Sequence, residues 1–179
     1  MTHCPLRIAV AALIVTAAPS ALAFGGTAGE LGQQGNFVVS NRANLGFSQS
    51  LNSPSTTSLA LAPELDYFVA PNFSIGGAVL FNFTTTSGRG NSATSVGIEP
   101  QVGYHVVLSD TWSFWPRLAV TLLTGTPGHV SVEASAPFLI HPAQHFFFGF
   151  GPAIASDLTG PDHFSAIFGE FMIGGYFNS

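Results

Sequence analysis

Apolar residues recur at every second position along most of this chain, and this alternation constrains the fold more than any other feature. In residues 37–48, Phe37, Val39 and Leu45 fall on one face, with Ser40 and Asn44 on the other. The pattern recurs over residues 58–69, 73–84, 95–106, 112–122, 130–140, 146–154 and, less regularly, 167–177. A period of two is the side-chain period of a β-strand with two different faces. The sequence therefore predicts about eight strands.

The chain is apolar but contains no segment that could cross a membrane as a helix. Its longest stretch without Asp, Glu, Lys or Arg after the N-terminal region runs from Ala134 to Ser156 and contains Pro137, Pro142 and Pro152. Proline breaks helical hydrogen bonding. The remaining fold that can span a bilayer is a closed barrel. We therefore expect an all-β fold, a closed antiparallel up-and-down transmembrane β-barrel, in which strand prolines mark bulges or strand limits.

The connections between the expected strands alternate in length, as they do in such barrels. Short turns are expected at residues 70–72, 109–111 and 141–144, the last formed by His141-Pro142-Ala143. Longer polar connections are expected at residues 48–57, 84–93 and 157–162. Short periplasmic turns and longer outer loops are the usual asymmetry of these proteins.

The N-terminus has the layout of a secretory signal peptide. Arg7 precedes an apolar stretch from Ile8 to Ala18, and Ala21-Leu22-Ala23 provides a small-residue cleavage pattern. We expect residues 1–23 to be removed, residues 24–34 to form a short N-terminal segment, and residues 35–179 to form one barrel domain. The only cysteine, Cys4, lies in the signal, so the mature chain is expected to have no disulfide and no thiolate metal site.

Composition decides which face of the strands should point outward. Charged residues make up 7% of the chain, which has no lysine, whereas a soluble domain carries roughly 25%. An apolar face directed at lipid explains this composition better than a water-facing surface does. The mature chain holds three arginines against nine acids, so nucleic acid is an unsuitable partner. The open alternative is a soluble periplasmic barrel that encloses an apolar ligand.

The polar face consists mostly of small residues that fit a narrow lumen, together with a set of charged residues. We expect these charges to form a paired network that plugs the lumen, because buried charges are costly unless they are paired. A gated polar pathway, making the protein a narrow porin-like channel for small solutes, is the functional alternative. The expected lumen residues are Arg42, Glu64, Asp66, Glu99, Arg117, Glu133 and Glu170.

Two segments share the pattern apolar-x-Pro-x-apolar-x-Tyr-x-Val. They are Leu61-Ala62-Pro63-Glu64-Leu65-Asp66-Tyr67-Phe68-Val69 and Ile98-Glu99-Pro100-Gln101-Val102-Gly103-Tyr104-His105-Val106. With Gly35-Asn36-Phe37-Val38-Val39, which opens the barrel, they resemble the bacterial outer-membrane β-barrel domain proteins, relatives of the small OmpA/OmpX-type barrels. The resemblance implies a Gram-negative outer-membrane location and no obligatory cofactor. It departs at the C-terminus, where Phe177 is followed by two polar residues.

One residue pair could carry chemistry. His163 and Ser165 are spaced i, i+2 and resemble the His-x-Ser pair of outer-membrane lipid A deacylases, which also use a Glu. Here Glu170 has the opposite strand parity to Ser165 and would face the lumen, which disfavours a lipid hydrolase, although this enzyme stays an open alternative. The histidines at 105, 129, 141 and 145 have no metal-ligand spacing, and His141 and His145 are expected to be solvated turn residues. Arg89 is expected in a solvated loop.

The leading expectation is therefore a monomeric, non-enzymatic integral outer-membrane barrel without metal or cofactor. Its partners would be outer-membrane lipid and an extracellular ligand or protein at the outer loops, including Thr85 to Ala93. A channel, a lipid hydrolase and a soluble ligand-binding barrel are the rival functions.

Overall fold

The computed structural model is a closed barrel of eight antiparallel strands. This confirms the predicted all-β fold, a closed antiparallel barrel. The structure describes residues 28–50, 53–86, 91–124, 129–159 and 165–178. Three of the eight strands are each divided in two, by breaks between β4 and β5, β6 and β7, and β8 and β9. The elements are α1 (Ala28–Leu31), β1 (Phe37–Ser50), β2 (Ser53–Ala70), β3 (Phe73–Thr86), β4 (Asn91–Tyr104), β5 (Val106–Val107), β6 (Trp112–Phe114), β7 (Arg117–Leu123), β8 (His129–Ser135), β9 (Phe138–Ala143), β10 (Phe146–Asp157) and β11 (Ser165–Phe177).

The barrel closes through β11, which pairs with β1 on one side and with β10 on the other. Phe37 pairs with both Phe177 and Tyr67, so the first and last strands begin and end at the same level. A closed ladder has no unpaired strand edge. Unpaired edges are the feature that makes sheets prone to associate.

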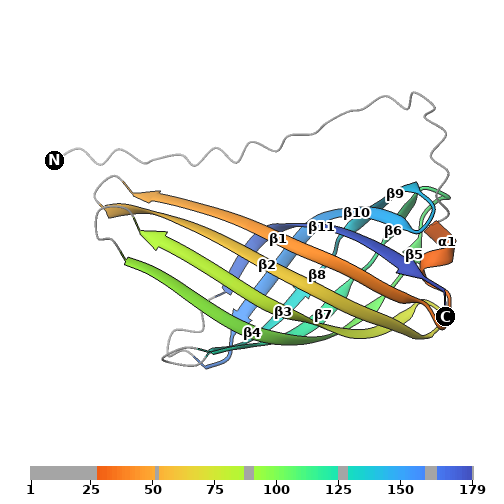
Figure 1. Cartoon of the computed structure of the whole chain (residues 1–179), viewed down its shortest axis with the longest axis horizontal. Helices are drawn as coiled ribbons and strands as arrows, with labels where there is room; N and C mark the ends of the chain where they lie inside the picture. The colour runs from red at the N-terminus through yellow and green to blue at the C-terminus, as the bar shows by residue number, and fades with distance from the viewer. Residues whose placement is uncertain (1–27, 51–52, 87–90, 125–128, 160–164, 179) are drawn as a thin grey trace.

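One end of the barrel, here called the turn end, carries the short turns and α1 (Figure 1). Asn72, in the turn between β2 and β3, has a φ of 64°, and His145, between β9 and β10, has a φ of 61°. The expected turn at residues 141–143 was wrong, because His141, Pro142 and Ala143 end β9. The ladder shifts register next to Ala143, and such an irregularity accommodates a proline.

At the opposite end, here called the loop end, the strands are longer than the sequence predicted. β1 reaches Ser50, β2 starts at Ser53 and β3 reaches Thr86, so most of residues 48–57 and 84–93 is strand. Thr56 pairs with Thr86 in this extension. Threonine has a high strand propensity, but a ladder with two polar faces gives no alternation signal. Within the expected outer loop at Thr85 to Ala93, residues 85–86 and 91–93 are strand, and residues 87–90 lie outside the described residues.

Two prolines account for two of the strand breaks. Pro116 separates β6 from β7, and Pro137 separates β8 from β9. Their carbonyls still accept hydrogen bonds across the break, from Tyr104 N at 3.0 Å and from Trp115 N at 3.0 Å. Proline lacks a donor but keeps its acceptor, so the sheet continues across each break in weakened form.

The two faces of the strands follow the predicted alternation. Large apolar side chains point outward along the wall, and the exposed fraction is 54% for Leu65, 56% for Ile98 and 68% for Phe171. Arg42, Glu64 and Glu170 point inward and are at most 4% exposed. No helix among the described residues has the length and hydropathy needed to cross a membrane.

Candidate functional site

The lumen is filled in successive layers along the barrel axis. Nearest the turn end lies a group here called the apolar plug, followed by an ionic group here called the charge network. The apolar plug consists of Leu31, Val38, Phe68, Trp115, Leu139, Phe147, Met172 and Tyr176. The charge network consists of Arg42, Glu64, Glu99, Arg117, Glu133 and Glu170.

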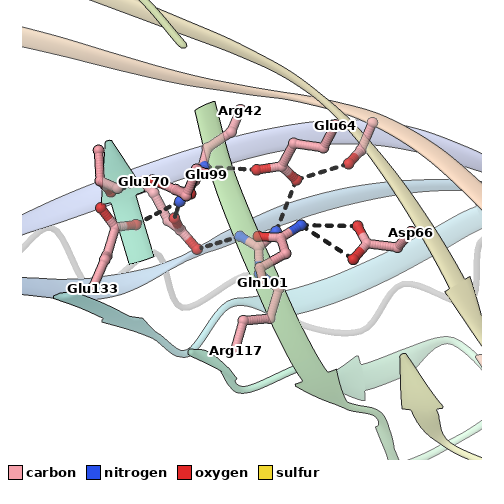
Figure 2. Close-up of polar contacts among 10 residues, drawn as sticks. Arg42, Glu64, Asp66, Glu99, Gln101, Arg117, Glu133 and Glu170 are labelled. Atoms are coloured by element: carbon pink, nitrogen blue, oxygen red, sulfur yellow. Dashed lines mark hydrogen bonds and ion pairs between the residues drawn. The ribbon is translucent and has the colours of Figure 1, made fainter. Parts of the chain in front are cut away.

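Arg42, on β1, is at the centre of the charge network (Figure 2). Its Nε lies 2.8 Å from Glu64 Oε1 on β2, and its Nη1 lies 3.5 Å from Glu170 Oε2 on β11. Nη1 also donates to Glu133 on β8, and Nη2 donates to Glu99 on β4. One guanidinium therefore contacts carboxylates from four other strands, a multiple donation that the planar fork of arginine permits.

Arg117, on β7, completes the network from the opposite wall. It donates from Nη1 to Glu64 Oε2 at 2.8 Å and from Nη2 to Glu170 Oε1 at 3.0 Å. Its Cζ lies 5.4 Å from the centre of the Trp115 ring, in cation–π geometry. Glu64 and Glu170 thus bridge the two arginines, and Trp115 joins the charge network to the apolar plug.

Polar side chains that the sequence did not single out complete the network. Gln101 donates to both oxygens of Asp66, at 3.1 and 3.0 Å, and Ser40 donates to Glu64 Oε2 at 3.0 Å. Thr121 donates to Glu99 Oε2 at 2.6 Å. All three residues have the sequence parity of the inward face, which could have identified them as lumen residues. Parity alone does not distinguish a member of the network from a side chain that only fills space.

The structure therefore places all seven expected lumen residues inside the barrel, and none is more than 9% exposed. It joins six of them through ion pairs, while Asp66 contacts Gln101. Two guanidiniums face five carboxyl groups in this region, so acids are in excess. The arrangement can fix the relative positions of the strands, since four of these six ion pairs join strands that are not neighbours in the sheet.

The turn end is closed by α1 and the residues after it. Gly32 O accepts from Asn72 N at 2.7 Å, and Gly35 N donates to Phe68 O at 2.9 Å. Leu31 is fully buried in the apolar plug. The sequence did not predict this closure, and the expectation of a lumen filled mainly by small residues was wrong here, because aromatic and long apolar side chains occupy this layer.

Two histidines are buried at the turn end, and the expectation of a solvated His141 was wrong. His105 and His141 are both 0% exposed, with ring centres 6.5 Å apart. His141 Nε2 shares a hydrogen bond of 2.9 Å with the Ser113 hydroxyl. His105 lies beyond the end of β4, level with the turn residue Asn72, whose carbonyl accepts from its backbone N. Burial, with a smaller effect from His141, lowers the pKa of His105 to about 4.

The remaining candidate residues give little support to an enzyme. His163 and Arg89 lie outside the described residues, and Ser165 opens β11. Glu170 lies in the charge network, where both arginines contact its carboxylate, so it is not free to act with Ser165. Among the residues that the structure describes, no group of three or more His, Cys, Asp or Glu side chains could hold a metal ion.

The chain was also compared with known proteins. Its sequence matches no family model and no curated protein, and its structure matches no solved structure. The function must therefore be inferred from the barrel and its lumen.

Proposed function

We propose that the mature protein is an integral outer-membrane β-barrel with a non-enzymatic structural or surface-interaction role and a lumen plugged by its own side chains. The observation that carries this proposal is the inverted polarity of the barrel, apolar outside and ionic inside. The exposed belt includes Val39 at 50%, Ile75 at 45%, Leu118 at 52%, Phe148 at 46% and Ile173 at 44%. A monomeric soluble protein rarely exposes an apolar patch larger than a few hundred Å².

The buried charges argue against the soluble ligand-binding alternative. A soluble barrel places its apolar face inside, around the ligand. Here the middle of the lumen holds Arg42 and Arg117 among carboxylates, while large apolar side chains face outward. Lipid is the partner that this outer surface fits, and the closed ladder is consistent with a monomer.

The filled lumen favours a structural role over conduction. The charge network crosses the lumen, and the apolar plug and α1 close the turn end behind it. A solute would have to displace both layers to pass through. We therefore expect planar-bilayer recordings of the purified protein to stay at baseline, and steady single-channel steps would support the channel instead.

The turn end carries two-residue turns after β2 and after β9, and β1 to β4 extend at the loop end. The turn end would face the periplasm, and the loop end would face the exterior. Export would depend on residues 1–23, which lie outside the described residues. Contacts with an extracellular ligand or protein would form at the loop end.

The test is to dilute urea-unfolded residues 24–179 into phospholipid vesicles and, in parallel, into buffer alone. We expect a folded species only with lipid, recognised by a gel band that shifts on boiling and by resistance to carbonate extraction of the vesicles. A protein that folds in buffer alone, stays monomeric and shows no heat-dependent shift would contradict the proposal.

A further inference from the structure

A cavity of about 410 Å³ lies in the lumen on the loop-end side of the charge network. We call this cavity the vestibule. Arg42, Glu99 and Glu133 form its floor, and Asn82, Ser131 and Phe168 lie in its wall. A pocket of this volume suits a small molecule.

The floor of the vestibule selects against anions. The Nε, Nη1 and Nη2 atoms of Arg42 each already contact a carboxylate. An anion would have to displace one of these carboxylates and would meet the others. Because two arginines face four glutamates in the charge network, the floor has an excess of acid that favours a positively charged ligand.

Two polar groups of the vestibule remain available for such a ligand. The contacts of Glu133 with Arg42 run through Oε1. Ser131 is 6% exposed and lines the vestibule, and its hydroxyl enters none of the side-chain hydrogen bonds within the described residues. This hydroxyl and Glu133 together indicate a ligand that carries a positive charge and a hydrogen-bonding group.

The rest of the wall indicates an organic cation rather than a metal ion. Phe168 and Leu80 line the cavity together with the polar residues. An aromatic ring near carboxylates attracts ammonium groups, including quaternary ones. No group of three or more metal-ligating side chains was found among the described residues.

We propose that the vestibule binds a small organic ammonium compound that also carries a hydroxyl group, entering from the loop end. Glu133 would face the ammonium group, and Ser131 would hydrogen-bond the hydroxyl. The inference depends on the geometry of the lumen and not on the membrane location, so the two proposals can fail separately.

The test compares two probes on the protein refolded in a non-ionic detergent. One probe is choline, and the other is its neutral isostere 3,3-dimethylbutan-1-ol. Isothermal titration should show saturable choline binding, with the isostere at least about tenfold weaker, a difference of about 1.4 kcal/mol. Acetate should not bind. No choline binding, or equal affinity for the two probes, would overturn the proposal.

Two variants show whether the charge of the vestibule is responsible. Glu133→Gln should weaken choline binding by about tenfold or more, because it removes the carboxylate that faces the ammonium group. Asp66→Asn is the matched control, since it also removes one lumen acid but does not line the vestibule. It should change the affinity by less than about threefold. Unchanged binding by Glu133→Gln would overturn the assignment.

A third variant keeps the test usable if Glu133→Gln does not refold. Ala60 lines the vestibule and makes no ionic contact, so Ala60→Phe should fill the space while leaving every charge in place. We expect Ala60→Phe to refold and to lose choline binding. Retained binding would place the choline outside the vestibule and overturn the proposal.

Discussion

The guanidinium of Arg42 contacts four carboxylates, so its removal would leave several buried acids without a cation. We expect Arg42→Leu to lower the free energy of unfolding by about 3–5 kcal/mol, the usual cost of breaking a buried ion pair. Urea titration of the protein in lipid vesicles measures this change. Arg42→Lys should fall between the wild type and Arg42→Leu, because it keeps the charge but loses the planar fork. A change below about 1 kcal/mol for Arg42→Leu would contradict the importance assigned to the network.

His105 makes the turn end sensitive to acid. Its pKa of about 4 lies below the ordinary value of 6.5, so the unfolded state binds more protons between these two values. Stability contributed by the neutral ring is thus fully present above about pH 6.5 and is lost as the pH falls toward 4. The groups around the ring include His141 on β9, Phe68 on β2 and the Asn72 turn.

We therefore expect the wild type to lose stability between about pH 6.5 and 4 and His105→Phe to lose less. Urea midpoints at several pH values, read from tryptophan fluorescence, measure the effect. An equal acid dependence in the two proteins would show that His105 is not responsible.

Individual residues also show how far the sequence could predict the lumen. Alternation alone placed Arg42, Glu64 and Glu170 inside, because side-chain direction in a strand is fixed by parity. The same parity placed Trp115 inside, but its apolar ring gave no sign of stacking near Arg117. His141 was misplaced because its proline neighbour resembles a turn. The pairing of each arginine with particular acids depends on distances across the barrel, which no local pattern contains.

Among the elements, α1 closes the turn end of the barrel. It spans Ala28–Leu31, too short to be stable alone or to give a helical period. Its position depends on contacts with distant parts of the chain, including Ala28 N to Asp110 O at 2.8 Å and the burial of Leu31. The sequence therefore showed only a short segment before the barrel.

We expect Leu31→Asp to open the turn end without unfolding the strands, because the change places a charge in the apolar plug. Trp115 is fully buried beside Leu31 in this cluster, whereas Trp112 is 40% exposed. In a Trp112→Phe background, acrylamide quenching of Trp115 should rise severalfold. Leu158→Asp, at an exposed position near the loop end, is the matched control and should leave quenching unchanged. Equal quenching in Leu31→Asp and its parent would contradict a closing role for α1.

At the scale of the whole molecule, the barrel is defined by an apolar exterior and an ionic interior. Composition and alternation together predicted this arrangement, since so few charges cannot cover a water-facing surface. They could not predict the apolar plug, because a strand with apolar side chains on both faces reads as a continuous apolar run. Residues 146–150, Phe-Phe-Phe-Gly-Phe, illustrate this: Phe147 is fully buried and Phe148 is 46% exposed.

The most direct test of the membrane-spanning proposal places arginine at two depths on the same outward face of β4. Ile98 is 56% exposed near the middle of the strand, and Thr94 is exposed four residues away, about 13 Å along the strand toward the loop end. In lipid vesicles, Ile98→Arg should lower the free energy of unfolding by about 2–4 kcal/mol and Thr94→Arg by about 0–1 kcal/mol. Effects within about 0.5 kcal/mol of zero for both variants, as on a surface in water, would contradict a membrane-spanning barrel.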